Sequence, residues 1–398
     1  MYSCKPEELG REIPSAVIVG GHFHSLGAVR NLARHGISVY VVDNDLCVAR
    51  FSRHVRRFFK CPPTSDEAEF VDFLVHLAVK ANLTGCVLFP SDDECVRIFA
   101  QHRECLSEYY LMTTPPWDIV RFVYDKRLTH RLATEQGVPV PETYNPGSLD
   151  DLVSLDMGFP LVLKPAISTH LMSVTRKKAY RADDMQELIN LYEMMAAIID
   201  PSEILIQELV PGRAENLFSF AGFFKDGVTV AGLSARRPRQ HPMEFGRAST
   251  FVETVNVPEL ETLATQFLQG IAYSGLAEVE FMYDQKDERF ELLEVNPRIW
   301  GWHSIAIRAG LDLPYLVYLD ALGKKVTAGS VCQDAKWVRL VTDVPTAVQE
   351  ILAGRLTMRQ YLASLSGDTE FAVLSLSDPF PFLADILLIP YYMKHRGF

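Results

Sequence analysis

Short apolar runs alternate with amphipathic segments in the first third of the chain. The apolar runs lie at 15–20, 38–43, 85–90 and 108–112, and the helical patterns lie at 25–35 and 69–81. Such alternation of strand and helix is typical of a mostly parallel sheet with right-handed crossovers. We therefore predict a Rossmann-like α/β domain that ends near residue 115.

The pattern changes in the middle of the chain. Helical patterns lie at 126–136 and 183–199, and apolar strands at 159–164 and 204–210. Two hairpins follow, each folded about a polar turn: 218–224 with 228–234, and 276–283 with 289–295. The chain ends in an apolar, aromatic tail at 386–392, which is too short to span a bilayer and for which we expect a surface helix or a packed strand.

These changes divide the chain into four units. They are a Rossmann-like domain (1–115), a small subdomain (116–205), a large subdomain (206–330) and a C-terminal extension (331–398). We expect an α/β fold, with α+β character in the two middle units. The length of 398 residues fits two to four domains.

Composition excludes several classes of protein. The chain carries 39 Lys and Arg against 50 Asp and Glu, a net charge of −11, whereas duplex binding usually needs a basic face. No apolar run is long enough to cross a bilayer, and the N-terminal residues lack the apolar core of a signal peptide. The seven cysteines are scattered without a C-x-x-C pair, so neither a disulfide framework nor a zinc site is expected. We predict a cytoplasmic protein with no nucleic-acid partner and no transmembrane segment.

The turn after the first strand resembles a dinucleotide-binding loop but departs from it. A dinucleotide site requires G-x-G-x-x-G, and here His22 and Ser25 occupy the second and third glycine positions. Asp43 does end the next strand, where an acid that binds ribose would lie. We favour a βα turn that binds no nicotinamide, and we interpret His22 and His24 as structural or surface residues.

Two strands of the second hairpin carry the strongest candidate site. If Tyr283 pairs with Glu291, Glu280 lies opposite Glu294, and two carboxylates at such a position repel each other. A divalent cation would remove the conflict, and Asn296 adds a neutral oxygen of the kind that Mg²⁺ accepts. The alternative is a solvated acidic face in which Glu280 or Glu294 pairs with Arg298.

Basic residues elsewhere indicate an anionic ligand. Lys164 ends an apolar strand and Lys126 begins a helix, positions that suit contacts with phosphate oxygens beside a metal. A basic run follows the first hairpin and contains Arg236, Arg237, Arg239 and Arg247. This run predicts either a clamp for a substrate carboxylate or a solvated loop.

The order of these segments carries a family resemblance. The chain has L-V-L-K-P at 161–165, I-L-I-Q-E-L-V-P-G at 204–212, V-E-F-M at 279–282 and L-L-E-V-N-P-R at 292–298, after a Rossmann-like domain and a lysine. This ordered set resembles the ATP-grasp superfamily over at least residues 16–325. The segments N-P-R-I-W-G and A-G-L-D-L-P-Y-L resemble its carboxylate–amine ligase branch, which includes D-aspartate ligases.

The resemblance implies a set of site residues. Lys126 and Lys164 would bind the phosphates of ATP, the backbone of Gln207, Glu208, Leu209 and Val210 would bind adenine, and Glu215 would bind the ribose; Glu280, Glu294 and Asn296 would hold Mg²⁺ or Mn²⁺, and Arg298 would act in catalysis on the transferred phosphoryl group. Arg236, Arg247 and His303 are candidates for substrate binding. Many ATP-grasp proteins carry a glycine-rich lid after the second lysine, whereas residues 165–178 contain no glycine here, and the identity of the lid residues stays open.

The resemblance also implies an activity. We expect an ATP-dependent ligase that joins a small carboxylic acid to an amine through an acyl phosphate and releases ADP and phosphate. Two alternatives remain open, namely a carboxylase-type ATP-grasp enzyme with a nucleophile other than an amine, and a nucleotide-binding regulator without turnover. A dehydrogenase is disfavoured because the glycine fingerprint fails. The identity of both substrates stays open, as does a homodimeric assembly.

Overall fold

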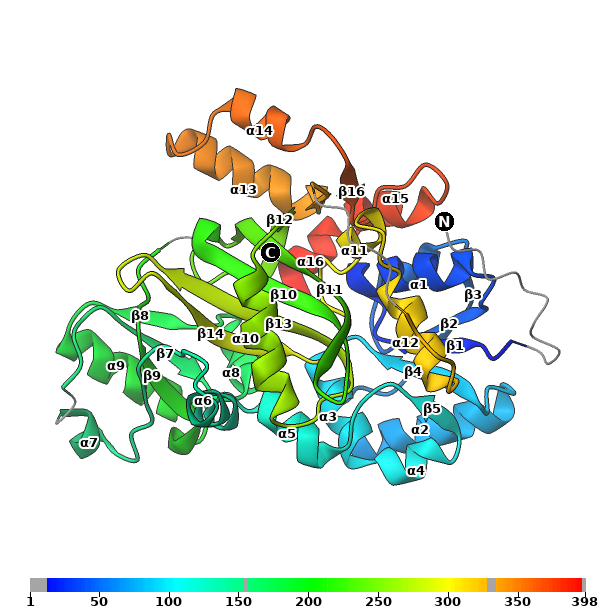
Figure 1. Ribbon diagram of the computed structural model, residues 1–398, viewed down its shortest axis with the longest axis horizontal. Coiled ribbons are helices and arrows are strands. Elements are labelled where there is room, and N and C mark those ends of the chain that lie inside the picture. The colour runs from blue at the N-terminus through cyan, green and yellow to red at the C-terminus, as the bar shows by residue number, and fades with distance from the viewer. Residues whose placement is uncertain (1–12, 154–155, 213, 328–333, 396–398) are drawn as a thin grey trace.

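Three β-sheets organise the chain, and helices cover them (Figure 1). The computed structural model describes residues 13–153, 156–212, 214–327 and 334–395. The three sheets follow one another along the chain. The last two strands, β15 and β16, extend the third sheet at the edge formed by β12.

The first sheet is parallel, with five strands in the order β3-β2-β1-β4-β5. Its strands are β1 (Ala16–Val19), β2 (Val39–Asp43), β3 (Val55–Lys60), β4 (Cys86–Pro90) and β5 (Tyr110–Met112). Its helices are α1 (Phe23–Arg34), η2 (Ala49–Phe51), α2 (Glu67–Lys80), α3 (Asp93–Gln101) and α4 (Arg103–Ser107). The alternating pattern therefore predicted the parallel α/β unit correctly.

The second sheet is small and antiparallel, in the order β6-β9-β7-β8. Its strands are β6 (Thr143–Tyr144), β7 (Leu161–Pro165), β8 (Tyr180–Ala182) and β9 (Ile204–Glu208). The helices of this part are α5 (Trp117–Tyr124), α6 (Lys126–Glu135), α7 (Leu149–Val153), α8 (Ser168–Thr175), α9 (Met185–Ala196) and η3 (Pro201–Glu203). Because β9 belongs to this sheet, it crosses the predicted boundary between residues 205 and 206.

The third sheet has seven strands in the order β14-β13-β10-β11-β12-β15-β16. Its strands are β10 (Leu217–Lys225), β11 (Val228–His241), β12 (Ala248–Val255), β13 (Gly275–Asp284), β14 (Arg289–Asn296), β15 (Lys336–Val338) and β16 (Thr369–Phe371). The helices of this part are η4 (Ala214–Asn216), α10 (Pro258–Gln269), α11 (Ile305–Arg308), α12 (Leu313–Ala321), α13 (Leu340–Leu352), α14 (Met358–Ser364), α15 (Phe380–Leu387) and α16 (Ile389–His395). The apolar tail is thus helical.

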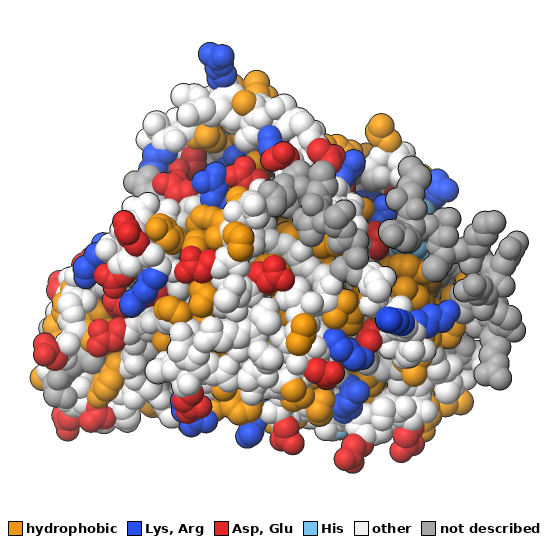
Figure 2. Space-filling view, in the orientation of Figure 1, with side chains coloured by type: hydrophobic (Ala, Val, Ile, Leu, Met, Phe, Trp, Pro, Cys, Tyr) orange, Lys and Arg blue, Asp and Glu red, His pale blue; other side chains and the backbone are white. Residues whose placement is uncertain are grey.

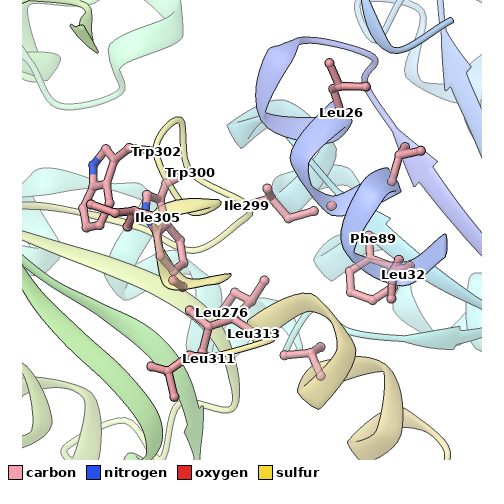
Figure 3. Packing of buried hydrophobic residues seen from close by; sticks show 14 of the residues in the cluster. Leu26, Leu32, Phe89, Leu276, Ile299, Trp300, Trp302, Ile305, Leu311 and Leu313 are labelled. Carbon is pink, nitrogen blue, oxygen red and sulfur yellow. The ribbon is translucent and has the colours of Figure 1, made fainter. Parts of the chain in front are cut away.

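One hydrophobic core joins the first sheet to the third. It combines residues of β1, β2 and α1 with residues of β10 and β11 and with the segment after β14. Figure 3 shows Ile299 between α1 on one side and Trp300, Trp302 and Ile305 on the other, and both tryptophans are fully buried. This shared core holds the carboxyl end of the first sheet against the end of β14, where the candidate site lies.

The outer surface carries mixed charges. Figure 2 shows acidic and basic side chains scattered over the visible face without a single-sign patch. Among the residues that the structure describes, no helix is both long enough and apolar enough to cross a membrane.

Candidate functional site

The site is centred on the hairpin of β13 and β14, where two glutamates face each other. Glu280 pairs directly with Glu294, as the sequence predicted. The register near the turn differs from the assumed one, since Tyr283 pairs with Phe290, and a bulge between Glu280 and Phe281 restores the predicted pairing. The carboxylates therefore face each other because of one extra residue in β14.

Basic side chains from other elements offset the charge of these carboxylates. Arg237 of β11 donates to Glu280 at 2.6 Å, Lys178 donates to Glu294, and the Lys126 Nζ lies 3.4 Å from Glu294. Burial raises the pKa of Glu294, but Lys178 and Lys126 outweigh it and hold this pKa well below its usual range. Glu294 is therefore ionised across the physiological range.

Glu278 and Asn296 extend the cluster by one pair of the ladder. The Asn296 Nδ2 donates to Glu280 at 2.8 Å and to Glu278 at 3.2 Å, and its Oδ1 accepts from Arg298 at 3.1 Å. Glu278 also accepts from the Trp302 indole at 2.8 Å. Burial and the neighbouring Glu280 raise the pKa of Glu278 to about 7.

The oxygens of this cluster suit a hard cation. The carboxylates of Glu280 and Glu294 and the Asn296 Oδ1, which accepts from Arg298 in the structure, form a donor set that Mg²⁺ accepts when phosphates and waters complete its shell. The described part of the chain holds no group of three or more His, Cys, Asp or Glu arranged to bind a metal. In the structure, Lys178 forms an ion pair with Glu294, and Arg237 forms one with Glu280.

The two predicted phosphate-binding lysines are buried near these carboxylates. Lys126 begins α6 and donates to the Ser168 hydroxyl at 2.6 Å, and Lys164 of β7 donates to the Gln207 Oε1 at 2.8 Å. Burial, reinforced by Lys126, lowers the pKa of Lys164 from 10.5 to about 7. A buried lysine whose contacts are an amide and a second cation is poised to bind an anion.

The glycine-poor segment after Lys164 forms a helix. Residues Ser168–Thr175 make α8, and Arg176 follows it in a left-handed conformation with φ of 59°. The chain then returns so that Lys178 reaches Glu294. The segment in the position of the predicted lid thus places a lysine directly on the carboxylate pair.

The strand predicted to bind adenine connects the second sheet to the third. Gln207 and Glu208 end β9, and Leu209 and Val210 follow it. The backbone and side chain of Glu208 both bond to the backbone of Glu142, at 3.0 and 2.8 Å. Glu215 lies in η4 and is exposed.

Two cavities adjoin Lys126. A cavity of about 640 Å³ opens beside α6, the 137–145 segment and β9, and its lining includes His130, Leu205 and Arg289. A smaller one of about 30 Å³ is lined by Lys126, Glu294, Asn296 and Asp93. Of the residues predicted to bind ATP, Lys126 alone lines the larger cavity. That cavity has the size of a small-molecule site.

Arg298 lies beyond Asn296 and reaches the first domain. Its guanidinium donates to both oxygens of Asp93, at 2.7 and 3.2 Å. Burial lowers the pKa of Arg298, but Asp93 and other nearby carboxylates outweigh this and raise it, so Arg298 stays charged. The alternative in which Arg298 pairs with Glu280 or Glu294 is therefore not adopted.

The three candidates for substrate binding lie apart from each other. Arg236 pairs with Glu253 across the ladder of β11 and β12, with Nε at 2.9 Å from Oε1. Arg247 lies between β11 and β12, and burial and Arg176 lower its pKa. His303 is buried against Gly27, and burial lowers its pKa to about 4. Their predicted role in binding stays a prediction.

Three charged residues contact Glu280, Glu294 or Arg298 in a way that the sequence analysis did not predict. Arg237 and Lys178 stood in basic runs, and the strand period of two places Arg237 on the opposite face from Arg236. Asp93 lies in an S-D-D-E turn after β4, where the carboxyl end of a parallel strand is a known position for ligands. That positional rule was the available signal.

The first βα turn has a structural role. The Asp43 carboxylate accepts from the backbone N–H of Gly21 at 2.5 Å and of Asp45 at 2.9 Å. A side chain added at Gly21 would meet the Cys47 sulfur at 2.2 Å. Asp43 therefore stabilises this turn.

Known proteins resemble this chain in sequence. A family model described as "ATP-grasp in the biosynthetic pathway with Ter operon" matches residues 232–344, which include the hairpin of β13 and β14. D-aspartate ligase of Enterococcus faecium is 24% identical over 343 residues, which cover 82% of this chain and 79% of that protein.

Solved structures agree as well. The L-amino acid ligase of Bacillus licheniformis superposes with a TM-score of 0.59 at 18% identity, over 78% of this chain and 74% of that one. The biotin carboxylase domain dimer of Hydrogenobacter thermophilus 2-oxoglutarate carboxylase, solved with MgADP and bicarbonate, gives a TM-score of 0.65 at 15% identity, over 82% and 74% of the two chains.

The chain resembles ATP-grasp proteins in sequence and in fold. The predicted resemblance to the superfamily is confirmed, and the similarities to D-aspartate ligase and L-amino acid ligase support its carboxylate–amine ligase branch. In this chain the carboxylates of β13 and β14, the lysines of β7 and α6, and Arg298 converge from three parts of the sequence.

Proposed function

We propose that this chain is an ATP-dependent carboxylate–amine ligase. One observation carries the proposal: Glu280 faces Glu294 in an ATP-grasp fold, with Lys126 and Lys178 beside Glu294 and Arg237 beside Glu280. This arrangement of paired acids and converging cations suits a triphosphate with its metal ion. The ligase relatives favour an amine as the second substrate.

In the proposed reaction a substrate carboxylate attacks the γ-phosphate of ATP and forms an acyl phosphate and ADP. Lys126 and Lys164 bind phosphate oxygens, and Arg298 stabilises the transferred phosphoryl group and the oxyanion that forms later. Glu280, Glu294 and Asn296 would hold Mg²⁺, which supplies charge neutralisation on the phosphates when it is bound. An amine then displaces phosphate and gives an amide.

No nucleophilic side chain is needed for this chemistry. Positioning and electrostatic stabilisation provide most of the rate enhancement in phosphoryl transfer. Burial is consistent with that role, because Lys126 and Lys164 are at most 9% exposed and their charges act in a medium of low polarity. Residues Gln207–Val210, at the end of β9, and Glu215 would bind the nucleoside.

The test is a screen for ATP-dependent release of ADP and phosphate. The purified chain is incubated with MgATP, hydroxylamine and each of the common L-amino acids, D-aspartate or simple dicarboxylic acids, and hydroxamate formation is measured beside ADP. An acid that supports both products confirms acyl activation. Release of AMP and pyrophosphate, or no turnover with any acid, would contradict the proposal, and the second result would favour a nucleotide-binding regulator.

A carboxylase is the second candidate because the biotin carboxylase domain gives a TM-score of 0.65. It differs from a ligase in its nucleophile, so the same chain is assayed with labelled bicarbonate in place of hydroxylamine. ADP release that depends on bicarbonate, with label retained in an acid-stable product, would favour the carboxylase. ADP release that depends on an added acid favours the ligase.

A further inference from the structure

The contacts of the site form an ordered path from the second sheet to the first domain. The Lys164 side chain donates to Gln207 of β9, and the Lys126 Nζ lies 3.4 Å from Glu294 on β14. Two residues further along the strand, Asn296 accepts from Arg298 at 3.1 Å. The path therefore leads from the proposed nucleoside end, through the phosphate-binding cations, to Arg298.

The path ends on Asp93, which belongs to the first domain. Asp93 begins α3 directly beyond β4, and both of its oxygens accept from Arg298. The Asp93 side chain is 31% exposed. A carboxylate that reaches across from another domain to the end of the path lies where the second half of the reaction would take place.

The two acidic residues next to Asp93 form hydrogen bonds with other partners. Asp92 caps α3 by accepting from the Cys95 N–H at 2.8 Å. Glu94 accepts from the Tyr124 hydroxyl at 2.6 Å and from Thr169 of α8 at 2.8 Å. Asp93 therefore differs from both, because its partner in the structure is Arg298, a residue of the proposed catalytic machinery.

Asp93 also lines the small cavity of about 30 Å³. The cavity is bounded by Lys126 of α6, by Glu294 and Asn296 of β14, and by Ser168 and Thr169 of α8. Such a volume holds about two water molecules, so a nitrogen atom fits there while a whole substrate requires some opening. Lys126 contributes a positive charge to the lining, whereas Glu294 and Asp93 contribute negative charges that suit a cationic group.

We propose that Asp93 recognises the attacking amine as its ammonium and positions it beside the acyl phosphate. This inference rests on the proposed function and adds the class of the second substrate, a primary amine that is charged before it reacts. When Arg298 turns to the developing oxyanion, the Asp93 carboxylate becomes available to the ammonium. The ammonium first loses one proton to solvent. The amine nitrogen then forms the bond to the acyl carbon, the bond between that carbon and the phosphate oxygen breaks, and the nitrogen gives its second proton to the departing phosphate.

The test compares a charged with an uncharged nucleophile. The acid that gives the largest ADP release in the screen is paired with hydroxylamine, which is mainly uncharged near neutral pH, or with the L-amino acid that is the best acceptor in the same assay. Asp93→Asn keeps the shape and removes the charge, Asp93→Glu keeps the charge, and Asp72→Asn on the exposed face of α2 is the matched control.

For D93N we expect the KM of the amino-acid acceptor to rise about 10- to 100-fold, as for the loss of one charge partner. The KM of hydroxylamine should rise less than that of the amino acid, D93E should recover part of the affinity, and D72N should match the wild type. Thermal unfolding verifies that each variant is folded.

Three results would overturn the inference. An equal loss with both nucleophiles would mean that Asp93 only holds Arg298 in place, and a rise in the KM of the acid alone would place the ammonium on the other substrate. An unchanged acceptor KM would remove Asp93 from recognition altogether. A wild-type chain that forms no hydroxamate with any acid would instead refute the proposed function, so the two failures are distinguishable.

Discussion

Lys164 should take up a proton when ATP binds. Its amine is buried in β7, donates to Gln207 at 2.8 Å and lies near the second cation, Lys126. Burial and Lys126 lower its pKa from 10.5 to about 7 in the ligand-free chain. Phosphate oxygens favour the charged amine, so binding should return the pKa of Lys164 toward its ordinary value.

The expected magnitude follows from the two pKa values of Lys164. The difference between 10.5 and about 7 corresponds to about 5 kcal/mol against the charged form in the empty site. At pH 8 about nine tenths of the Lys164 side chains are neutral, so binding takes up about 0.9 proton, and at pH 6 it takes up about 0.1. The association constant for ATP should therefore fall as the pH rises above about 7, by up to tenfold per pH unit.

Isothermal titration calorimetry measures this proton directly. A non-hydrolysable ATP analogue with Mg²⁺ is titrated at pH 6 and pH 8 in two buffers of different ionisation enthalpy, and the difference in heat counts the protons. Lys164→Arg is the matched control, because arginine keeps the charge and does not titrate in this range. An uptake at pH 8 below about 0.3 proton, or an equal uptake by both chains, would refute the reasoning.

Three further predictions concern the carboxylate pair, a buried ion pair and a helix cap. Glu294→Gln removes one of the two facing carboxylates, so Mg²⁺-dependent ADP release should fall at least about 100-fold while the circular dichroism spectrum is unchanged; near-normal turnover would refute the metal assignment. Asp343→Ala leaves Arg239 buried without its two hydrogen bonds of 2.8 and 3.0 Å, and urea unfolding should show a loss of about 3–5 kcal/mol, whereas a loss below about 1 kcal/mol would contradict it. Thr357→Ala removes the capping box of α14 and should cost about 1 kcal/mol in the same experiment, with no loss meaning that the cap is not needed.

Local patterns predicted many of the strands and some of the helices, but not β3, β12 or α10. The alternation of apolar runs and amphipathic helices predicted the parallel sheet, because a buried strand and a half-buried helix leave different periods in the sequence. The polar turn at 284–288 predicted the hairpin of β13 and β14. The strands of the C-terminal part were not predicted. β15 and β16 have three residues each, too few to show an apolar pattern, and they form by pairing with β12 and with each other.

The chemistry of the site was predicted in part for the same reason. Glu280, Glu294 and Asn296 lie on two adjacent strands, and the strand period puts Glu294 and Asn296 on one face. Glu280 lies opposite Glu294 because of the bulge between Glu280 and Phe281. Their counter-charges come from distant segments, since Arg237 reaches Glu280 from β11 and Lys178 reaches Glu294 from the segment after α8. No period in the sequence relates residues that meet only through folding.

The sequence by itself predicted two carboxylates and an amide close together on one hairpin, because near neighbours on paired strands are fixed by the geometry of the backbone. Only the tertiary structure decided which cations offset these acids and which domain closes the end of the site. Arg298 meets Asp93 across 205 positions of the chain, and a single core of residues from α1 and the segment after β14 holds the two domains in that contact. Such a meeting depends on how whole sheets pack, which is a property of buried surface and not of local spacing.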